Sequence, residues 1–149
     1  MGWKVILPDR YVKPVEQKIH EIAGSLRDSV PAEGGLMGGK AGLALFYSCY
    51  ARCTRDRSFD GLVIDWIEQA LNLSNSQNPG LSYANGLGGI GWLIDYLDSS
   101  GLMPLNADPV LKKLDEHLYL FMKDEIYAGH YDYLHGALGI VLYFLRDPG

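Results

Sequence analysis

The stretch GKAGL at residues 39–43 decides the fold, because it recurs twice further along the chain. The matching stretches are GLGGI at residues 86–90 and GALGI at residues 136–140. The second glycines of the three copies, Gly42, Gly89 and Gly139, are 47 and 50 residues apart. A period of this length is typical of helical hairpins. The sequence therefore predicts a tandem array of three hairpins.

An amphipathic segment precedes each copy. Its apolar residues recur at helical spacing and its charged residues lie on the opposite face, which predicts surface helices with one buried face. Asp60 is the expected N-cap of the second segment, and Asp108 followed by proline marks the start of the third. The apolar stripes are Val15, Ile19, Ile22 and Leu26; Leu62, Val63, Trp66, Ile67, Ala70 and Leu71; and Leu111, Leu114, Leu118, Phe121 and Met122.

A segment that is apolar almost all round follows each copy, at residues 43–51, 90–97 and 140–145. Such a pattern indicates a helix covered on every side, although short apolar runs also fit strands. Alternation of the two helix types predicts an outer layer of amphipathic helices around an inner layer. The expected fold is all-α, an α/α toroid or solenoid. One domain, residues 1–149, would hold repeats at about 9–53, 60–99 and 107–146.

The glycines of the first copy also resemble a phosphate-binding loop, since Gly34, Gly39 and Lys40 have the spacing G-x-x-x-x-G-K. Ala41 stands where that loop needs a hydroxyl for Mg²⁺, and no apolar strand precedes it. Glycine inside a helix costs about 1 kcal/mol relative to alanine. Its recurrence at the start of three helices therefore favours close approach of a neighbouring backbone or of a substrate over nucleotide binding.

Composition and charge exclude several classes of function. The formal net charge is −5 and the basic residues are scattered, so no nucleic-acid partner is expected. No apolar stretch is long enough for a membrane span or a signal peptide. The two cysteines, Cys49 and Cys53, lie four apart in an apolar stretch, unlike a secreted disulfide framework. We expect a soluble cytoplasmic protein.

The repeats resemble those of the lanthionine synthetase C-like (LanC-like) family. Inner helices of that family open with S-x-x-x-G-x-x-G-[IL] or D-x-x-x-G-x-x-G-I. LSYANGLGGI matches the first form through Ser82, and YDYLHGALGI matches the second through Asp132. The first copy has Gly35 at the place of the serine. The resemblance covers nearly the whole chain and implies an α/α toroid of seven hairpins, of which this chain holds about three, as a fragment or as a truncated relative.

For function, the resemblance implies zinc-dependent thioether formation. A peptide cysteine, bound to Zn²⁺ as thiolate, adds to dehydroalanine or dehydrobutyrine, as in lantibiotic biosynthesis. The implied partners are a precursor peptide with cysteine and dehydrated Ser/Thr, and a dehydratase. The zinc ligands of the family, one Cys and a Cys-His pair, are not present in this chain, so we expect no cofactor here, zinc in a full-length member, and no activity from this chain alone.

Two residues are the candidate catalytic site. By the resemblance, Asp132 matches an acid thought to assist proton transfer beside the zinc. His135 follows three residues later and could carry a proton with it. The alternatives are that Asp132 is only an N-cap and that His135 is merely polar or supports the site from outside. His130 is near in sequence, but its spacing fits no known metal pair.

Other residues have structural interpretations that we favour. Cys49 and Cys53 could form half a zinc site, but buried free cysteine is ordinary core material. His20 and His117 are expected on the solvated surface. The tyrosines in or beside the inner helices could line a peptide groove or pack in the core. They are Tyr47, Tyr50, Tyr83, Tyr96, Tyr131, Tyr133 and Tyr143.

Two other functions remain open at this point. One is a non-catalytic peptide-binding scaffold of the same fold. The other is a different toroid enzyme, such as a carbohydrate hydrolase, which would need two cavity-facing carboxylates; Asp132 and Asp95 are the candidates. Because repeat units rely on neighbours to cover their apolar faces, we also expect self-association through the open side of the array.

Overall fold

The computed structural model describes residues 7–76 and 80–145, and none of these residues forms a strand. The all-α prediction is therefore confirmed for the described part of the chain. No helix within it is both long and apolar enough to cross a membrane. The elements are α1 (Asp9–Arg27), α2 (Lys40–Thr54), the 3-10 helix η1 (Arg57–Phe59), α3 (Asp60–Ser76), α4 (Leu87–Ser99), α5 (Asp108–Tyr127) and α6 (Ala137–Phe144).

The chain divides into two units, Met1–Val30 and Pro31–Gly149. The first unit holds α1, which begins after Pro8 and carries Pro14 inside it. The second unit holds α2 to α6. The first predicted hairpin, residues 9–53, spans both units, so its pairing stays a prediction.

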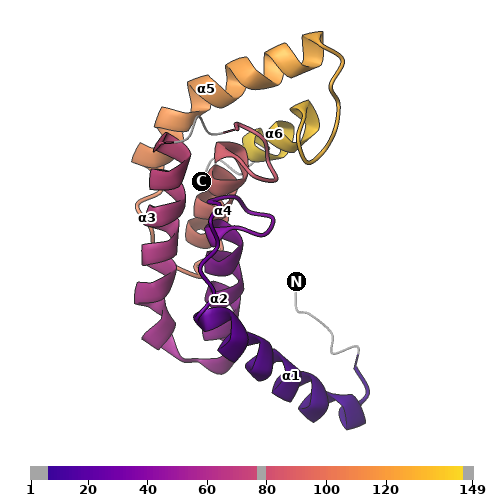
Figure 1. Ribbon diagram of the computed structural model, residues 1–149, viewed down its shortest axis with the longest axis vertical. Helices are drawn as coiled ribbons and strands as arrows, with labels where there is room; N and C mark the ends of the chain where they lie inside the picture. Colours follow the sequence, from indigo (N-terminus) through magenta and orange to yellow (C-terminus); the bar gives the residue numbers. More distant parts are fainter. Residues whose placement is uncertain (1–6, 77–79, 146–149) are drawn as a thin grey trace. The chain divides into compact units, whose positions relative to one another are not determined.

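The helices of the second unit form two layers. The inner helices α2, α4 and α6 pack side by side in sequence order, while α3 packs on α2 and α4 and α5 packs on α4 and α6. Figure 1 shows α3 running alongside α2 and α4. This alternation of inner and outer helices is that of a partial α/α toroid.

The outer helices α3 and α5 bury one face each, as their periodicity predicts. The stripe predicted for α1 is wrong, because Val15, Ile19 and Ile22 are 37%, 40% and 43% exposed. In α3 the buried positions are Val63, Trp66, Ile67 and Ala70, which follow the i, i+3, i+4, i+7 spacing of one helical stripe. Asp60 differs from the prediction, because it lies in the first turn of α3 instead of capping it. There its carboxylate accepts a hydrogen bond from the Nε of Arg57 at 2.7 Å.

The second glycine of each copy is required by a close approach. The loop before each inner helix folds back over the first helical turn. A Cβ on Gly42 would lie 2.5 Å from the carbonyl oxygen of Leu36. A Cβ on Gly89 or Gly139 would collide with the corresponding carbonyl, of Tyr83 or Tyr133. The glycines are thus explained by the backbone of their own loop.

Backbone hydrogen bonds join the three loops in a row. The Met37 N–H donates to the Ala84 carbonyl at 2.9 Å, and the Ala84 N–H donates to the Leu134 carbonyl at 2.8 Å. These residues hold equivalent places in the three copies, two residues before each first glycine. The row therefore places the N-terminal ends of α2, α4 and α6 together at one end of the second unit.

Tyr143 fastens the inner layer to the outer layer. It is fully buried, and its hydroxyl lies 2.8 Å from Oδ1 of Asp115 and 3.2 Å from the carbonyl oxygen of Leu111, both on α5. Its ring packs on α4 at Gly91, where a Cβ would lie 2.7 Å from the ring. A small residue on α4 and a large one on α6 therefore set the distance between these helices.

The inner helices are not covered on every side, which corrects the expectation drawn from their all-round apolar pattern. On α2, Cys49, Arg52 and Cys53 are exposed, and on α4, Tyr96 is exposed and Trp92 half-buried. Arg52 and Cys53 lie three and four positions after Cys49, and Tyr96 lies four after Trp92, so the residues of each helix share one face. One face of each of these two helices therefore stays accessible to solvent or to a ligand.

Candidate functional site

Asp132 and His135 lie in the turn that leads into α6. Asp132 Oδ1 accepts a hydrogen bond from the backbone N–H of His135 at 2.6 Å. The same oxygen lies 3.3 Å from Nδ1 of His135, and the two side chains are 61% and 63% exposed. The structure therefore brings the two predicted site residues together at the mouth of an inner helix, in contact with solvent.

The turn also sets the charge of Asp132. The backbone hydrogen bond from His135 is the main cause that holds the pKa of the Asp132 carboxyl below its ordinary value. The N–H of Leu134 and the imidazole of His135 act in the same direction. The carboxylate is therefore ionised at neutral pH and accepts hydrogen bonds.

The N-cap alternative for Asp132 is wrong. The N-cap of α6 is Gly136, and no side chain caps it. The hydrogen bond that the Asp132 carboxylate accepts from the His135 N–H closes the preceding turn instead. Ser82 occupies the same place in the second copy, where its Oγ accepts the N–H of Asn85 at 3.4 Å. The first residue of the motif is thus a turn-closing acceptor, which the spacing alone did not reveal.

His130 takes a different partner. Its Nδ1 lies 3.2 Å from the Glu125 carboxylate at the end of α5. Its backbone carbonyl accepts the N–H of Ala137 at 3.0 Å. His130 therefore helps to hold the loop before α6, and the pair of Asp132 and His135 is formed without it.

An aromatic cluster includes Tyr133, which stands between Asp132 and His135 in the chain. The rings of Tyr83 and Tyr133 meet edge to face at 5.6 Å, and Tyr83 also contacts Trp92 at 5.7 Å. Trp92 in turn stacks on Tyr96 at 5.2 Å. Sequence reasoning missed Trp92, although its spacing of four from Tyr96 on an inner helix was a usable signal.

The tyrosines of this cluster differ in burial. Burial, with the neighbouring Tyr133 charge and a hydrogen bond to Tyr133, raises the pKa of Tyr83 to about 12. Tyr133 and Tyr96 are exposed. The cluster therefore offers neutral aromatic surface of the kind that binds apolar side chains and peptide planes.

The other predicted tyrosines divide between core and surface. Tyr47 and Tyr143 are fully buried and belong to the core. Tyr50 is half-buried and Tyr131 is exposed. The two tyrosine interpretations therefore apply to different residues.

The cysteines are not core residues, which corrects that expectation. Cys49 and Cys53 are free and exposed on one face of α2. The pKa of the Cys49 thiol is raised, mainly because its side chain is partly buried and secondly because Cys53 lies nearby. The positive charge of Arg52 acts in the opposite direction. His20 and His117 are exposed, as predicted.

The donor set does not fit a zinc ion. Over the described residues, no three His, Cys, Asp or Glu side chains come close enough to hold a metal. Cys49 and Cys53 together supply only two of the four ligands that zinc takes in proteins. We therefore derive no catalytic step through a metal on these residues. The two carboxylates considered for a carbohydrate hydrolase lie in different settings. Asp95 is half-buried within α4, whereas Asp132 lies exposed in a loop.

In the first copy, backbone N–H groups at the N-terminus of α2 are already bonded to the chain's own carbonyls. The N–H groups of Lys40 and Ala41 donate to the carbonyls of Glu33 and Gly34 at 3.0 and 3.1 Å. These are groups with which a phosphate-binding loop would hold its ligand. The Lys40 side chain is 6% exposed and lies beside Gln69 and other residues of α3.

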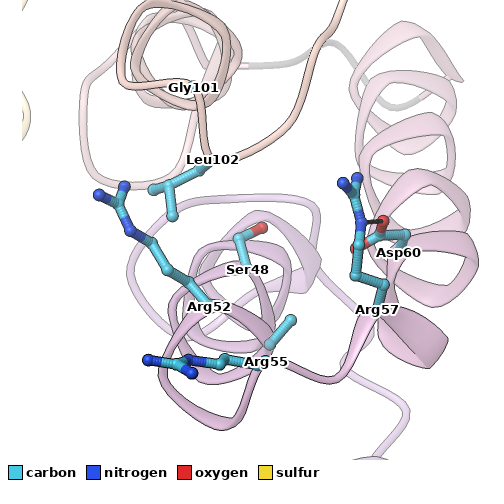
Figure 2. A pocket seen from close by; sticks show the side chains of 8 residues that line it. Ser48, Arg52, Arg55, Arg57, Asp60, Gly101 and Leu102 are labelled. Carbon is cyan, nitrogen blue, oxygen red and sulfur yellow. Dashed lines mark hydrogen bonds and ion pairs between the residues drawn. The ribbon is translucent and has the colours of Figure 1, made fainter.

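A cavity lies near the C-terminal end of α2. It has a volume of about 300 Å³. Figure 2 shows Arg52 and Arg55 pointing to one side of it, with Arg57 and Asp60 across from them. Sequence reasoning missed this site, although three arginines within six residues were visible. Its lining residues are Ser48, Ala51, Arg52, Arg55, Arg57, Asp60, Gly101 and Leu102.

Comparison with known proteins identifies a family. A family model described as lanthionine synthetase C-like protein matches residues 30–147. No curated protein and no solved structure matches the chain.

Proposed function

Because the chain belongs to the lanthionine synthetase C-like family, we propose that it forms one wall of a cytoplasmic peptide-modifying protein. Its substrate is a precursor peptide that contains cysteine and dehydrated serine or threonine, supplied by a dehydratase. The peptide lies across the mouths of the inner helices. The observation that carries the proposal is the exposed pair of Asp132 and His135 beside aromatic rings.

The reaction that fits this site is addition of a thiol to an alkene. The peptide sulfur forms a bond to Cβ of dehydroalanine, the electron pair of the C=C bond moves to Cα, and the thiol proton ends on Cα. Atoms and electrons balance without an oxidant. The reaction therefore needs a group that takes and returns one proton.

Asp132 and His135 suit that task. The ionised carboxylate favours a proton on Nδ1 of His135, which leaves the lone pair of Nε2 free. An imidazole held in this tautomer can accept a thiol proton at Nε2 and return it to carbon. Asp132 orients the ring, and His135 carries the proton. In a full-length member, zinc would supply thiolate activation from ligands outside the described residues.

A non-catalytic peptide-binding scaffold is the second candidate, and the aromatic cluster favours it. Tyr133 exposes flat apolar surface in the turn before α6, and Tyr83 and Trp92 connect it to the exposed ring of Tyr96 further along α4. Aromatic rings bind peptides at low conformational cost because they have few rotatable bonds. Under this alternative the Asp132 and His135 pair contributes affinity only.

One experiment separates these candidates. A fluorescent peptide with one cysteine and one dehydroalanine is titrated into the 149-residue chain, and binding is followed by anisotropy. Loss of alkylatable thiol measures ring formation, since cyclisation does not change the mass. Binding that weakens in Tyr133→Ala, with no thiol loss, supports the scaffold.

Thiol loss by the wild-type chain would overturn the expectation that this chain alone is inactive, and abolition of that loss in His135→Gln would assign the proton transfer to His135. His20→Gln is the control, because His20 is an exposed histidine on α1. If the wild-type chain neither binds the peptide nor consumes the thiol, the proposal is overturned.

A further inference from the structure

The cavity at the C-terminal end of α2 gathers positive charge in an acidic protein. Three arginines, Arg52, Arg55 and Arg57, line a hollow of about 300 Å³, although the chain has a formal net charge of −5. They come from the last turn of α2, from its C-cap and from η1. Leu102 and Ala51 supply apolar wall.

Only one of these arginines has its charge neutralised by a neighbour that the structure describes. Arg57 Nε donates to Asp60 Oδ2 at 2.7 Å. Arg52 and Arg55 form no ion pair within residues 7–76 and 80–145. The nearby acid Asp56 is turned to the backbone, where it accepts the N–H of Ser58 at 2.9 Å. Two guanidinium groups therefore remain available on one side of the cavity (Figure 2).

The backbone at Arg55 supports a role for its side chain. Arg55 has a φ of 57°, the left-handed conformation that glycine adopts without strain. The turns that follow α4 and α5 use glycine for it, at Gly101 and Gly129. The turn after α2 instead holds an arginine, whose guanidinium lies on the same side of the cavity as that of Arg52 (Figure 2). This choice costs backbone strain and adds a charged donor.

We propose that this cavity binds an oxyanion, a carboxylate or phosphate group, between Arg52 and Arg55. A guanidinium presents parallel N–H donors that match the oxygens of either group. Arg57, already held by Asp60, forms the far wall. The site lies apart from the turn of Asp132 and His135, so it is independent of the proposed reaction. Binding of a free anion here is expected to weaken with salt.

The test is an NMR titration of the ¹⁵N-labelled chain with two probes, inorganic phosphate and succinate, at low ionic strength. We expect saturable shifts of the Arg52 and Arg55 Nε–H signals and of backbone amides at residues 51–60 and 101–102. Saturation by phosphate alone identifies a phosphate site, and saturation by succinate alone identifies a carboxylate site. Saturation by neither overturns the proposal.

Arg55→Gly is the decisive variant, because it removes the guanidinium and places glycine where the backbone favours it. The variant is expected to fold with a Tm at or above that of the wild type, and to bind the anion at least about tenfold more weakly. Arg52→Gln should weaken binding to a similar extent. Arg52→Lys keeps the charge but not the paired donors, and should retain part of the affinity.

The matched control is the double variant Arg10→Gln/Arg27→Gln on α1. It removes two positive charges from the other unit, and it should bind as the wild type does. If this control loses as much affinity as Arg52→Gln/Arg55→Gly, the effect is general attraction to positive charge and the proposed site is wrong. Equal binding by Arg55→Gly and wild type also overturns the proposal.

Discussion

The carboxylate of Asp132 accepts the backbone N–H of His135 at 2.6 Å, and the same oxygen lies 3.3 Å from Nδ1 of that histidine. One side chain therefore closes a turn and orients an imidazole at the mouth of an inner helix. Ser82 closes the equivalent turn of the second copy. The Asp132 carboxylate and the Ser82 hydroxyl both close the turn, and the carboxylate also brings a negative charge.

The pH dependence of this turn follows from the pKa of Asp132, which lies below its ordinary value. A depressed pKa means that the bond to His135 stabilises the fold above the pKa of the unfolded chain, and that this contribution is lost as pH falls through the folded pKa. We expect the His135 amide signal to shift in NMR spectra as the pH falls below about 4. Asp132→Asn should remove this titration. A His135 amide that does not respond in the wild type would contradict the assignment.

Alanine at Gly139 should disrupt the second unit, because its Cβ would collide with the carbonyl of Tyr133 and crowd Tyr83. Overpacking against backbone atoms should cost about 1–3 kcal/mol or more in the free energy of unfolding. Gly61→Ala is the control, since a Cβ there meets nothing within 4 Å inside α3. That control should gain about 0.5–1 kcal/mol. Urea denaturation of both variants measures the difference.

Removing the hydroxyl of Tyr143 should loosen α6 from α5. Tyr143→Phe deletes the contacts to Asp115 and to the Leu111 carbonyl, and it leaves the ring in place. The expected loss is about 1–2 kcal/mol of unfolding free energy. Tyr119→Phe, at a 54% exposed position, should change stability by less than about 0.5 kcal/mol. Equal stabilities of the two variants would show that the buried hydroxyl contributes nothing.

Alkaline pH should destabilise the protein through Tyr83, whose pKa is raised to about 12. The unfolded chain loses this proton near pH 10, whereas the folded chain keeps it, so stability falls as pH rises from about 10 to about 12. Tyr83→Phe removes this contribution. Denaturation of both proteins across that range should show a smaller loss for the variant. Parallel pH profiles would contradict the raised pKa.

Apolar residues of the third copy are exposed where the equivalent residues of the first two copies are buried. We therefore expect self-association of the 149-residue chain. Tyr133 is 46% exposed, whereas Leu36 and Tyr83 at the equivalent places are 6% and 5% exposed. Leu138, in the first turn of α6, is 47% exposed. Size-exclusion chromatography with light scattering should report more than one chain. Leu138→Glu should lower the mass toward that of one chain, and a wild-type monomer would refute the prediction.

The repeating glycines and the two helix types were readable from the sequence, because both depend on local chemistry. Helical periodicity follows from 3.6 residues per turn, and it located the buried face of α3 at Val63, Trp66 and Ala70. The same pattern overstated the burial of α2 and α4. An apolar side chain on an inner helix can face a cavity as well as a core, and the sequence cannot distinguish these two settings.

The sequence by itself determined an all-α chain of tandem units and the proximity of Asp132 to His135, since these depend on residues a few places apart. Only the tertiary structure decided the role of the glycines, the exposure of Cys49 and the grouping of Tyr83 with Tyr133. It also decided the grouping of Arg52 and Arg55 with Leu102. Each of these depends on segments that fold back on or pack against one another, and hydrogen bonds between separate loops set that packing.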